Sequence, residues 1–167
     1  NLSFIPPRDG LRTVLLAPSL ASEDASTVTL AAADRLHADG HSVVVVDADL
    51  RRATATKAAG VTSSAGLSDL LAGRATLQQA TYDRSGAPIV AAGTTVGNAA
   101  ELLATETFAQ TLAELGREYD TVLLVGAPLL TYTDSSVIAA QVASVVPVVQ
   151  SGTVRRSQLQ QTLESLD

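Results

Sequence analysis

The chain of 167 residues contains no cysteine, no methionine and no tryptophan, and its eleven basic residues include a single lysine, Lys57. The absence of cysteine excludes disulfides, thiolate zinc sites and cysteine nucleophiles. His37 and His41, the only histidines, flank a predicted helix end and lack the further ligands that a metal site requires. Aromatic residues make up only 3% of the chain, so the core must consist of Ala, Val, Leu and Ile. Such a core is typical of a parallel sheet covered by helices.

Basic charge and long apolar runs are also scarce. The net charge of −6 argues against a protein that follows nucleic-acid phosphates, so we expect no nucleic acid as a partner. No apolar run approaches the roughly 18 residues that a membrane span requires. Because the chain does not begin with methionine, it either starts inside a longer protein or lacks its start residue. We expect a fragment of a longer protein, with any membrane anchor outside these residues.

Apolar runs alternate with helical patterns along the chain, which predicts one α/β domain over residues 1–167 with a mostly parallel central sheet and helices on both faces. Pro147 in the last run indicates an irregular or an edge position. The predicted strands are Thr13–Ala17, Val43–Asp47, Pro88–Ala91, Thr121–Val125 and Ser144–Val149. The predicted helices are Ser26–Asp39, Ala53–Ala59, Gly66–Gly73, Leu77–Ala80, Ala99–Ala104, Thr107–Glu118, Thr133–Val142 and Val154–Leu166.

The loop between the first strand and the first helix occupies the position of a phosphate-binding loop. In nucleotide-binding proteins of this layout the loop has the pattern G-x-x-x-x-G-K-[ST]. Here two hydroxyls are present, but glycines are replaced and Ala25 stands where the lysine belongs, while Lys57 lies beyond the second strand. We therefore predict a vestigial phosphate loop made of Ser22, Glu23, Asp24, Ala25, Ser26 and Thr27.

Two carboxylates, Asp47 and Asp49, end the second predicted strand. Open α/β sheets bind ligands at the carboxyl ends of their strands, so this is a candidate site. The alternative is structural: Asp47 can accept backbone N–H bonds at the loop, and Asp49 can pair with Arg51 or Arg52. Likewise, Ser22 or Asp24 can cap the first helix.

Several motifs in order and spacing resemble the cytoplasmic kinase domain of bacterial tyrosine kinases of capsule and exopolysaccharide synthesis. These kinases are related to the septum-site and chromosome-partitioning ATPases, which have deviant Walker motifs. The motifs are V-V-V-V-D-A-D-L-R-R at 43–52, G-L-S-D-L-L-A-G at 66–73, N-A-A-E-L-L at 98–103, Y-D-T-V-L-L at 119–124 and Thr133 with Asp134. The resemblance implies a three-layer α/β/α P-loop NTPase-like fold.

By this resemblance, Asp47 and Asp49 match the second acidic motif, which holds magnesium and activates the acceptor hydroxyl, and Ser26 matches a magnesium-ligating hydroxyl. Val125 stands where the family has the aspartate of D-T-P-P. Because phosphoryl transfer depends on positioning and charge stabilisation, losing the lysine and this aspartate removes most of the rate. We therefore expect a pseudo-kinase without catalytic residues, metal or cofactor, and ATP with Mg²⁺ only if the site is residual.

The resemblance further implies a regulatory or assembly module on the cytoplasmic side of the plasma membrane. It would act in capsule, exopolysaccharide or lipopolysaccharide synthesis and in the control of chain length. The expected partners are a transmembrane chain-length determinant segment, in the same or another chain, and further copies of the chain or a paralogous kinase. Two alternatives stay open: an ATP-binding tyrosine kinase or ATPase completed by a partner's cation, and a partitioning-type scaffold.

Overall fold

The computed structural model describes residues 12–62, 65–164 and 166. Its strands are β1 (Thr13–Pro18), β2 (Val43–Asp47), β3 (Thr81–Tyr82), β4 (Ile89–Val90), β5 (Thr121–Val125) and β6 (Ser144–Val148). Its helices are α1 (Ala25–Ala38), α2 (Thr54–Ala58), α3 (Leu67–Leu71), α4 (Leu77–Ala80), α5 (Ala99–Leu103), α6 (Glu106–Glu118), α7 (Asp134–Ala139) and α8 (Arg156–Glu164). None of the described helices is long and apolar enough to cross a membrane.

The strands form one sheet in the order β3-β4-β2-β5-β1-β6. All neighbouring pairs are parallel except β3 with β4, which is antiparallel. The predicted mostly parallel sheet is therefore confirmed, and of the two positions predicted for Pro147 the structure shows the edge, in β6. Because β1, β2 and β5 are parallel neighbours, their carboxyl ends meet at one edge of the sheet.

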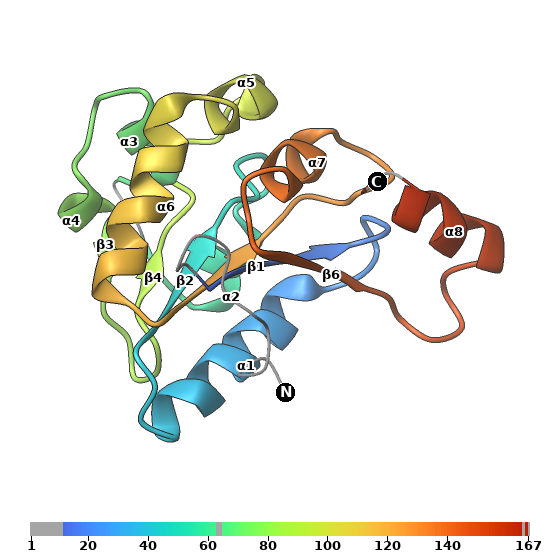
Figure 1. Ribbon diagram of the computed structural model, residues 1–167, viewed down its shortest axis with the longest axis horizontal. Helices are drawn as coiled ribbons and strands as arrows, with labels where there is room; N and C mark the ends of the chain where they lie inside the picture. Colours follow the sequence, from blue (N-terminus) through green and yellow to red (C-terminus); the bar gives the residue numbers. More distant parts are fainter. Residues whose placement is uncertain (1–11, 63–64, 165, 167) are drawn as a thin grey trace.

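Helices cover the sheet on both faces, which gives the predicted three layers (Figure 1). On one face, α1 and α2 pack on a cluster that includes Leu30, Ala33 and Ala55. On the other face, α3, α5, α6 and α7 pack on a larger cluster; its members include Leu67, Leu103, Phe108, Leu112, Leu115 and Ile138. Successive side chains of the buried strands feed the two clusters alternately, which is why these strands are continuous apolar runs.

The structure differs from the sequence prediction at short elements. Strand β3 was not predicted, because two residues carry no recognisable period, and it adds the antiparallel pair at one edge. Strand β4 is only Ile89–Val90, and α7 ends at Ala139 instead of Val142. The first and last helices also differ from their predicted limits by a few residues.

The G-L-S-D-L-L motif forms a corner with the loop after β4, which we call the motif corner and define as Gly66, Ser68, Asp69, Gly93 and Thr94. Asp69 accepts N–H bonds from Gly66 at 3.2 Å and from Thr94 at 3.0 Å, and Ser68 donates to the Thr94 carbonyl at 2.7 Å. A Cβ atom on Gly66 would overlap the backbone of Gly93. The motif thus meets a packing requirement.

Candidate functional site

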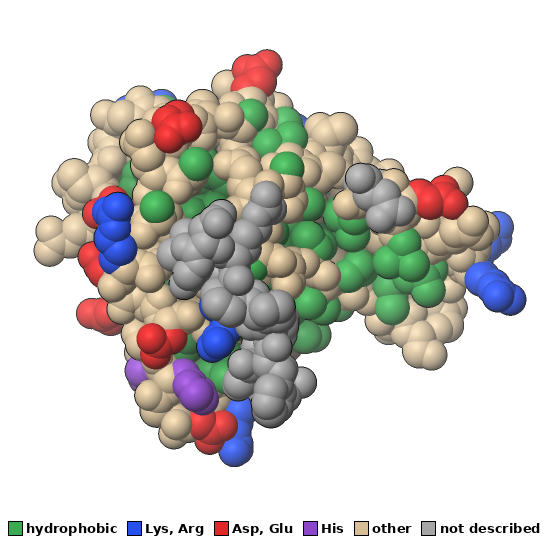
Figure 2. All heavy atoms as spheres, viewed as in Figure 1, with side chains coloured by type: hydrophobic (Ala, Val, Ile, Leu, Met, Phe, Trp, Pro, Cys, Tyr) green, Lys and Arg blue, Asp and Glu red, His purple; other side chains and the backbone are tan. Residues whose placement is uncertain are grey.

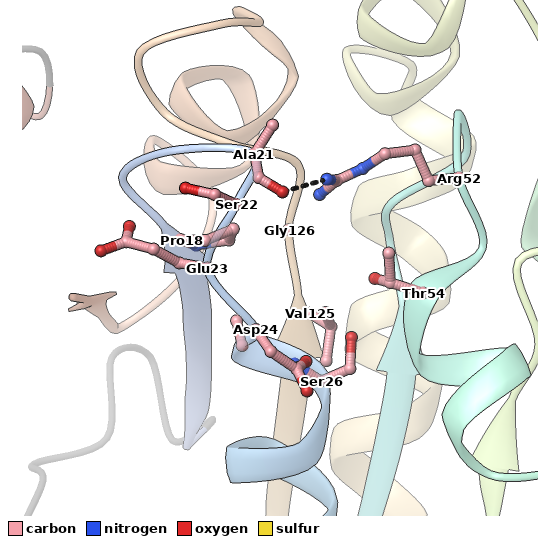
Figure 3. Close-up of a pocket in the computed structure, with 11 residues that line it drawn as sticks. Pro18, Ala21, Ser22, Glu23, Asp24, Ser26, Arg52, Thr54, Val125 and Gly126 are labelled. Carbon is pink, nitrogen blue, oxygen red and sulfur yellow. Dashed lines mark hydrogen bonds between the residues drawn. The ribbon is translucent and has the colours of Figure 1, made fainter. Parts of the chain in front are cut away.

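A pocket of about 270 Å³ lies at the sheet edge where β1, β2 and β5 end. The predicted phosphate-loop position forms one wall, and the loop after β2 forms the other (Figure 3). The lining residues are Pro18, Ala21, Ser22, Glu23, Asp24, Ala25, Ser26, Arg52, Thr54, Val125 and Gly126. Five of the six predicted loop residues thus line the pocket; Thr27, Asp47 and Asp49 do not.

Asp24 caps α1 with its own carboxylate. Its Oδ1 accepts the N–H of Ser26 at 2.8 Å and of Thr27 at 3.1 Å, and its Oδ2 accepts the Thr27 hydroxyl. The Thr27 hydroxyl is the main cause that holds the pKa of Asp24 below its ordinary value. Free N–H groups at a helix start are what binds phosphate in nucleotide sites. Here these two N–H groups already have an anionic partner within the chain.

Glu23, the neighbour of Asp24, holds the loop from the other side. Its side chain is nearly buried and accepts the N–H of Leu20 at 2.9 Å and of Gln150 at 2.7 Å. In Figure 3 its carboxylate points away from Arg52. The loop is therefore tied to the segment between β6 and α8.

Asp47 is fully buried at the end of β2 and turns toward α2. Its Oδ2 accepts the N–H and the hydroxyl of Thr56, both at 2.7 Å, and its Oδ1 accepts the N–H of Asp49 at 3.2 Å. Burial raises the pKa of Asp47 to about 6, although the bonds from Thr56 lower it. The side chain that would hold magnesium by the resemblance is engaged in this internal network.

Asp49 is also fully buried and pairs with Arg52, whose Nε lies 2.8 Å from its Oδ2. Arg52 also donates to the Ala21 carbonyl at 3.4 Å, so it bridges the two walls of the pocket (Figure 3). Of the two partners considered for Asp49, the structure selects Arg52. The pocket therefore has one cation in its lining, and that cation is already paired with a carboxylate.

Arg51 points elsewhere and joins three loops. Its Nε and Nη2 donate to the buried Asp134 at 2.7 and 3.1 Å, and its Nη1 donates to the Gly97 carbonyl at 3.0 Å. Its guanidinium also lies 4.6 Å from the centre of the Tyr132 ring, within the range of a cation–π contact. The Thr133-Asp134 motif therefore serves a structural ion pair.

The residues at the pocket do not fit ATP with magnesium. No lysine lines it, Val125 is apolar, and Asp24 brings negative charge to the position of the phosphates. No group of three or more His, Asp or Glu side chains in the described part of the chain could hold a metal ion. The predicted site did not include five lining residues. Pro18 and Gly126 directly follow predicted strands, Ala21 lies in the loop before the vestigial residues, and Arg52 and Thr54 come from the segment after Asp49.

Comparison with known proteins places this geometry in context. No family model matches the chain. It is 27% identical over 167 residues to a putative tyrosine-protein kinase EpsB from Ralstonia nicotianae, covering 99% of this chain but only 22% of the relative. It is 24% identical over 168 residues to the tyrosine-protein kinase YwqD from Bacillus subtilis, covering 99% of this chain and 71% of the relative. The chain thus spans about a fifth of one relative and most of the other.

Solved structures agree with these relatives. The VpsO kinase domain superposes with a TM-score of 0.87 at 29% identity, covering 93% of this chain and 78% of that one. Cobyrinic acid a,c-diamide synthase from Mycobacterium smegmatis, solved with ADP and magnesium, shares the fold with a TM-score of 0.76 at 19% identity over 93% of this chain and 66% of that one. The resemblance predicted from the motifs is confirmed: the chain is similar to the bacterial tyrosine kinases and has the P-loop NTPase-like fold of their kinase domains.

Proposed function

We propose that the chain is a catalytically inactive, nucleotide-free kinase-like domain that serves as a regulatory or assembly module in bacterial polysaccharide synthesis and chain-length control. It would work on the cytoplasmic side of the plasma membrane with a transmembrane chain-length determinant segment. The kinase relatives support the setting, and the geometry of the pocket supports the loss of catalysis.

The observation that carries the proposal is the position of the Asp24 carboxylate on the N–H groups of Ser26 and Thr27. A nucleotide phosphate would have to displace this internal anion and then lie beside it. Two like charges about 4 Å apart repel by about 4 kcal/mol at an effective dielectric constant near 20. Ala25 supplies no positive charge to offset that cost.

The acidic positions support the same conclusion. Asp47 is held by Thr56 and Asp49 by Arg52, so each carboxylate has a structural partner. For Asp47 to bind magnesium, these internal hydrogen bonds would have to break. Both positions therefore retain a structural function that accounts for their presence.

Calorimetric titration with ATP and MgCl₂ tests the loss of nucleotide binding. We expect a dissociation constant in the millimolar range or weaker, with YwqD titrated under the same conditions as the matched kinase. The double substitution Asp24→Gly with Ala25→Lys should strengthen binding more than either single change, because the two neighbours act on one site. A micromolar dissociation constant for the unaltered chain would overturn the proposal.

A second experiment tests the absence of chemistry at Asp49 in the full-length protein. Asp49→Asn should lower thermal stability, because the pair with Arg52 is weakened, and should leave polysaccharide length in cells unchanged. Loss of length control in a protein that stays folded would mean that Asp49 performs chemistry. The residual-kinase alternative would then replace the proposal.

A further inference from the structure

A second hollow lies between α4, β3 and the end of α6 (Figure 1). Its volume is about 470 Å³, which exceeds that of the pocket and is within the range of ligand-binding sites. Because it lies just before β5 begins, it is at the amino ends of the strands, whereas the pocket is at their carboxyl ends. We call it the acidic hollow and define it by Leu77, Asp83, Glu114, Leu115, Glu118 and Tyr119.

The floor of the acidic hollow is apolar and aromatic. Leu115 is buried in the larger core cluster, and the half-buried Leu77 and Tyr119 pack against that cluster. Leucine side chains and an aromatic ring can receive the methylene stem of a lysine or an arginine, and the ring can also face its positive charge. The floor therefore suits a long cationic side chain.

Three carboxylates surround this floor. Glu114 and Glu118 are exposed on one face of α6, and the exposed Asp83 follows β3. Burial is the main cause that raises the pKa of Tyr119, and the negative charges of Glu118 and Asp83 raise it further, so two elements bring their charge to the same ring. Figure 2 shows acidic side chains on this side of the molecule, with a basic one beside them.

Within the part of the chain that the structure describes, no cation pairs with these three carboxylates. The ion pairs of the other carboxylates use Arg35, Arg51, Arg52, Arg74 and Arg84. In addition, Glu114 and Glu118 repel each other across one turn, and they lie toward the carbonyl end of α6, where negative charge is unfavourable. An arrangement that opposes the local stability of a helix is expected at a functional site.

We propose that the acidic hollow binds a basic polypeptide segment, namely the cytoplasmic flank of the transmembrane partner. Segments next to a membrane span on the cytoplasmic side carry an excess of lysine and arginine. Such a segment complements three carboxylates around an apolar floor. The inference rests on the proposed assembly role and names the surface that would serve it. Because the acidic hollow and the pocket share no residue, its failure would leave the calorimetric result untouched.

Other occupants fit the acidic hollow less well. A metal ion requires ligands gathered at one point, and among the described residues no group of three acidic or histidine side chains could hold one. The carboxylates would repel an anionic membrane surface or a nucleic acid. Arg117, on the same helix, lines a neighbouring hollow, so it offsets the negative charge only in part.

Fluorescence anisotropy with a labelled peptide of alternating lysine and leucine residues tests the charge complementarity. Glu114→Gln with Glu118→Gln should weaken binding by about five- to thirtyfold, as expected for two partly exposed ion pairs, and should not lower thermal stability. The matched control, Glu101→Gln with Glu106→Gln, removes the same charge from exposed positions on α5 and at the start of α6, and should change binding by less than about twofold. Equal losses for the two double variants, or no binding by the unaltered chain, would overturn the proposal.

Photo-cross-linking in cells tests the identity of the segment. In the full-length protein, benzoylphenylalanine replaces Gln78, an exposed residue that lines the acidic hollow, or Glu101 as the control. We expect a cross-link from position 78 alone, mapped by mass spectrometry to within about 20 residues of a membrane span. The proposal would be overturned by no cross-link, by the same product from both positions, or by a cross-link to a segment remote from any span.

Discussion

The phosphate-loop position and the motif corner use a carboxylate in the same way and with different consequences. Asp24 and Asp69 each accept N–H bonds at the start of a helix. Asp24 is exposed, and its bonds are confined to the first turn of α1, whereas the nearly buried Asp69 joins α3 to the loop after β4. The loop has lost its family pattern, while the corner keeps its motif. Under the proposed loss of nucleotide binding, packing alone decides which residues of the loop must stay.

The largest expected effect is at Gly66 in the motif corner. Gly66→Ala should destabilise the fold by about 3 kcal/mol or more, because the added methyl group overlaps backbone that cannot move as a side chain can. Urea unfolding measures the loss. Gly97→Ala is the matched control, since a Cβ there meets nothing within 4 Å. Equal stability of the two variants would show that the corner is not tightly packed.

The second-largest loss of stability is expected at Asp69. Asp69→Ala leaves the N–H groups of Gly66 and Thr94 without their acceptor and should cost about 2–4 kcal/mol in unfolding free energy. Arg74→Ala removes only the ion pair with Asp69. Because the Arg74 side chain is 55% exposed, the unfolding free energy should fall by only about 0.5 kcal/mol. If the two losses were similar, the ion pair and not the backbone bonds would hold the corner.

Asp47 should make the free energy of unfolding depend on pH, in the opposite sense to Asp24 and Asp69. Its pKa is raised by burial to about 6 in the folded state, so the folded chain holds this proton more tightly than the unfolded chain. Asp47 therefore adds to the free energy of unfolding at low pH, and this contribution is lost as pH rises through about 6. Between pH 5 and 7.5 the unfolding free energy should fall by about 1.4 kcal/mol from this group.

Asp24 and Asp69 behave in the opposite sense, because their pKa values are lowered in the folded state. For Asp69, burial acts to raise the pKa, but bonds from Thr94 and Arg74 outweigh it. Their stabilisation is present above their unfolded pKa values and is lost as pH falls below about 4.

Chemical unfolding of the unaltered chain and of Asp47→Asn at several pH values isolates the Asp47 contribution. Parallel curves for the two proteins would contradict the expected effect.

The smallest effect is expected at the loop. Asp24→Ala removes the cap of α1 and should lower the unfolding free energy by about 1 kcal/mol. Asp39→Ala, which breaks only the exposed pair with Arg35 at the other end of α1, should cost a few tenths of a kcal/mol at most. A loss at Asp24 as large as that at Asp69 would mean that the loop is as tightly constrained as the corner.

The fold could be predicted from the sequence because its strands are continuous runs of Val, Leu and Ile. Thr81 and Tyr82 escaped prediction, since a strand of two residues depends on the neighbouring β4 for its existence. At the pocket, the cap of α1 follows from local sequence: Ser22 and Asp24 were the two predicted candidates, and Asp24 is the one that caps the helix. The hydrogen bond from the Gln150 N–H to Glu23 joins two segments that are far apart in the sequence. It could not be predicted, because it depends on how the fold brings these segments together.

Arg51 has a consequence for motion. It links the loops that follow β2, β4 and β5 through Asp134, the Gly97 carbonyl and the Tyr132 ring. Because one guanidinium contacts all three loops, we expect them to open together as one unit. Their amide protons should then exchange with deuterium at similar rates, as expected for a rigid platform that presents a surface.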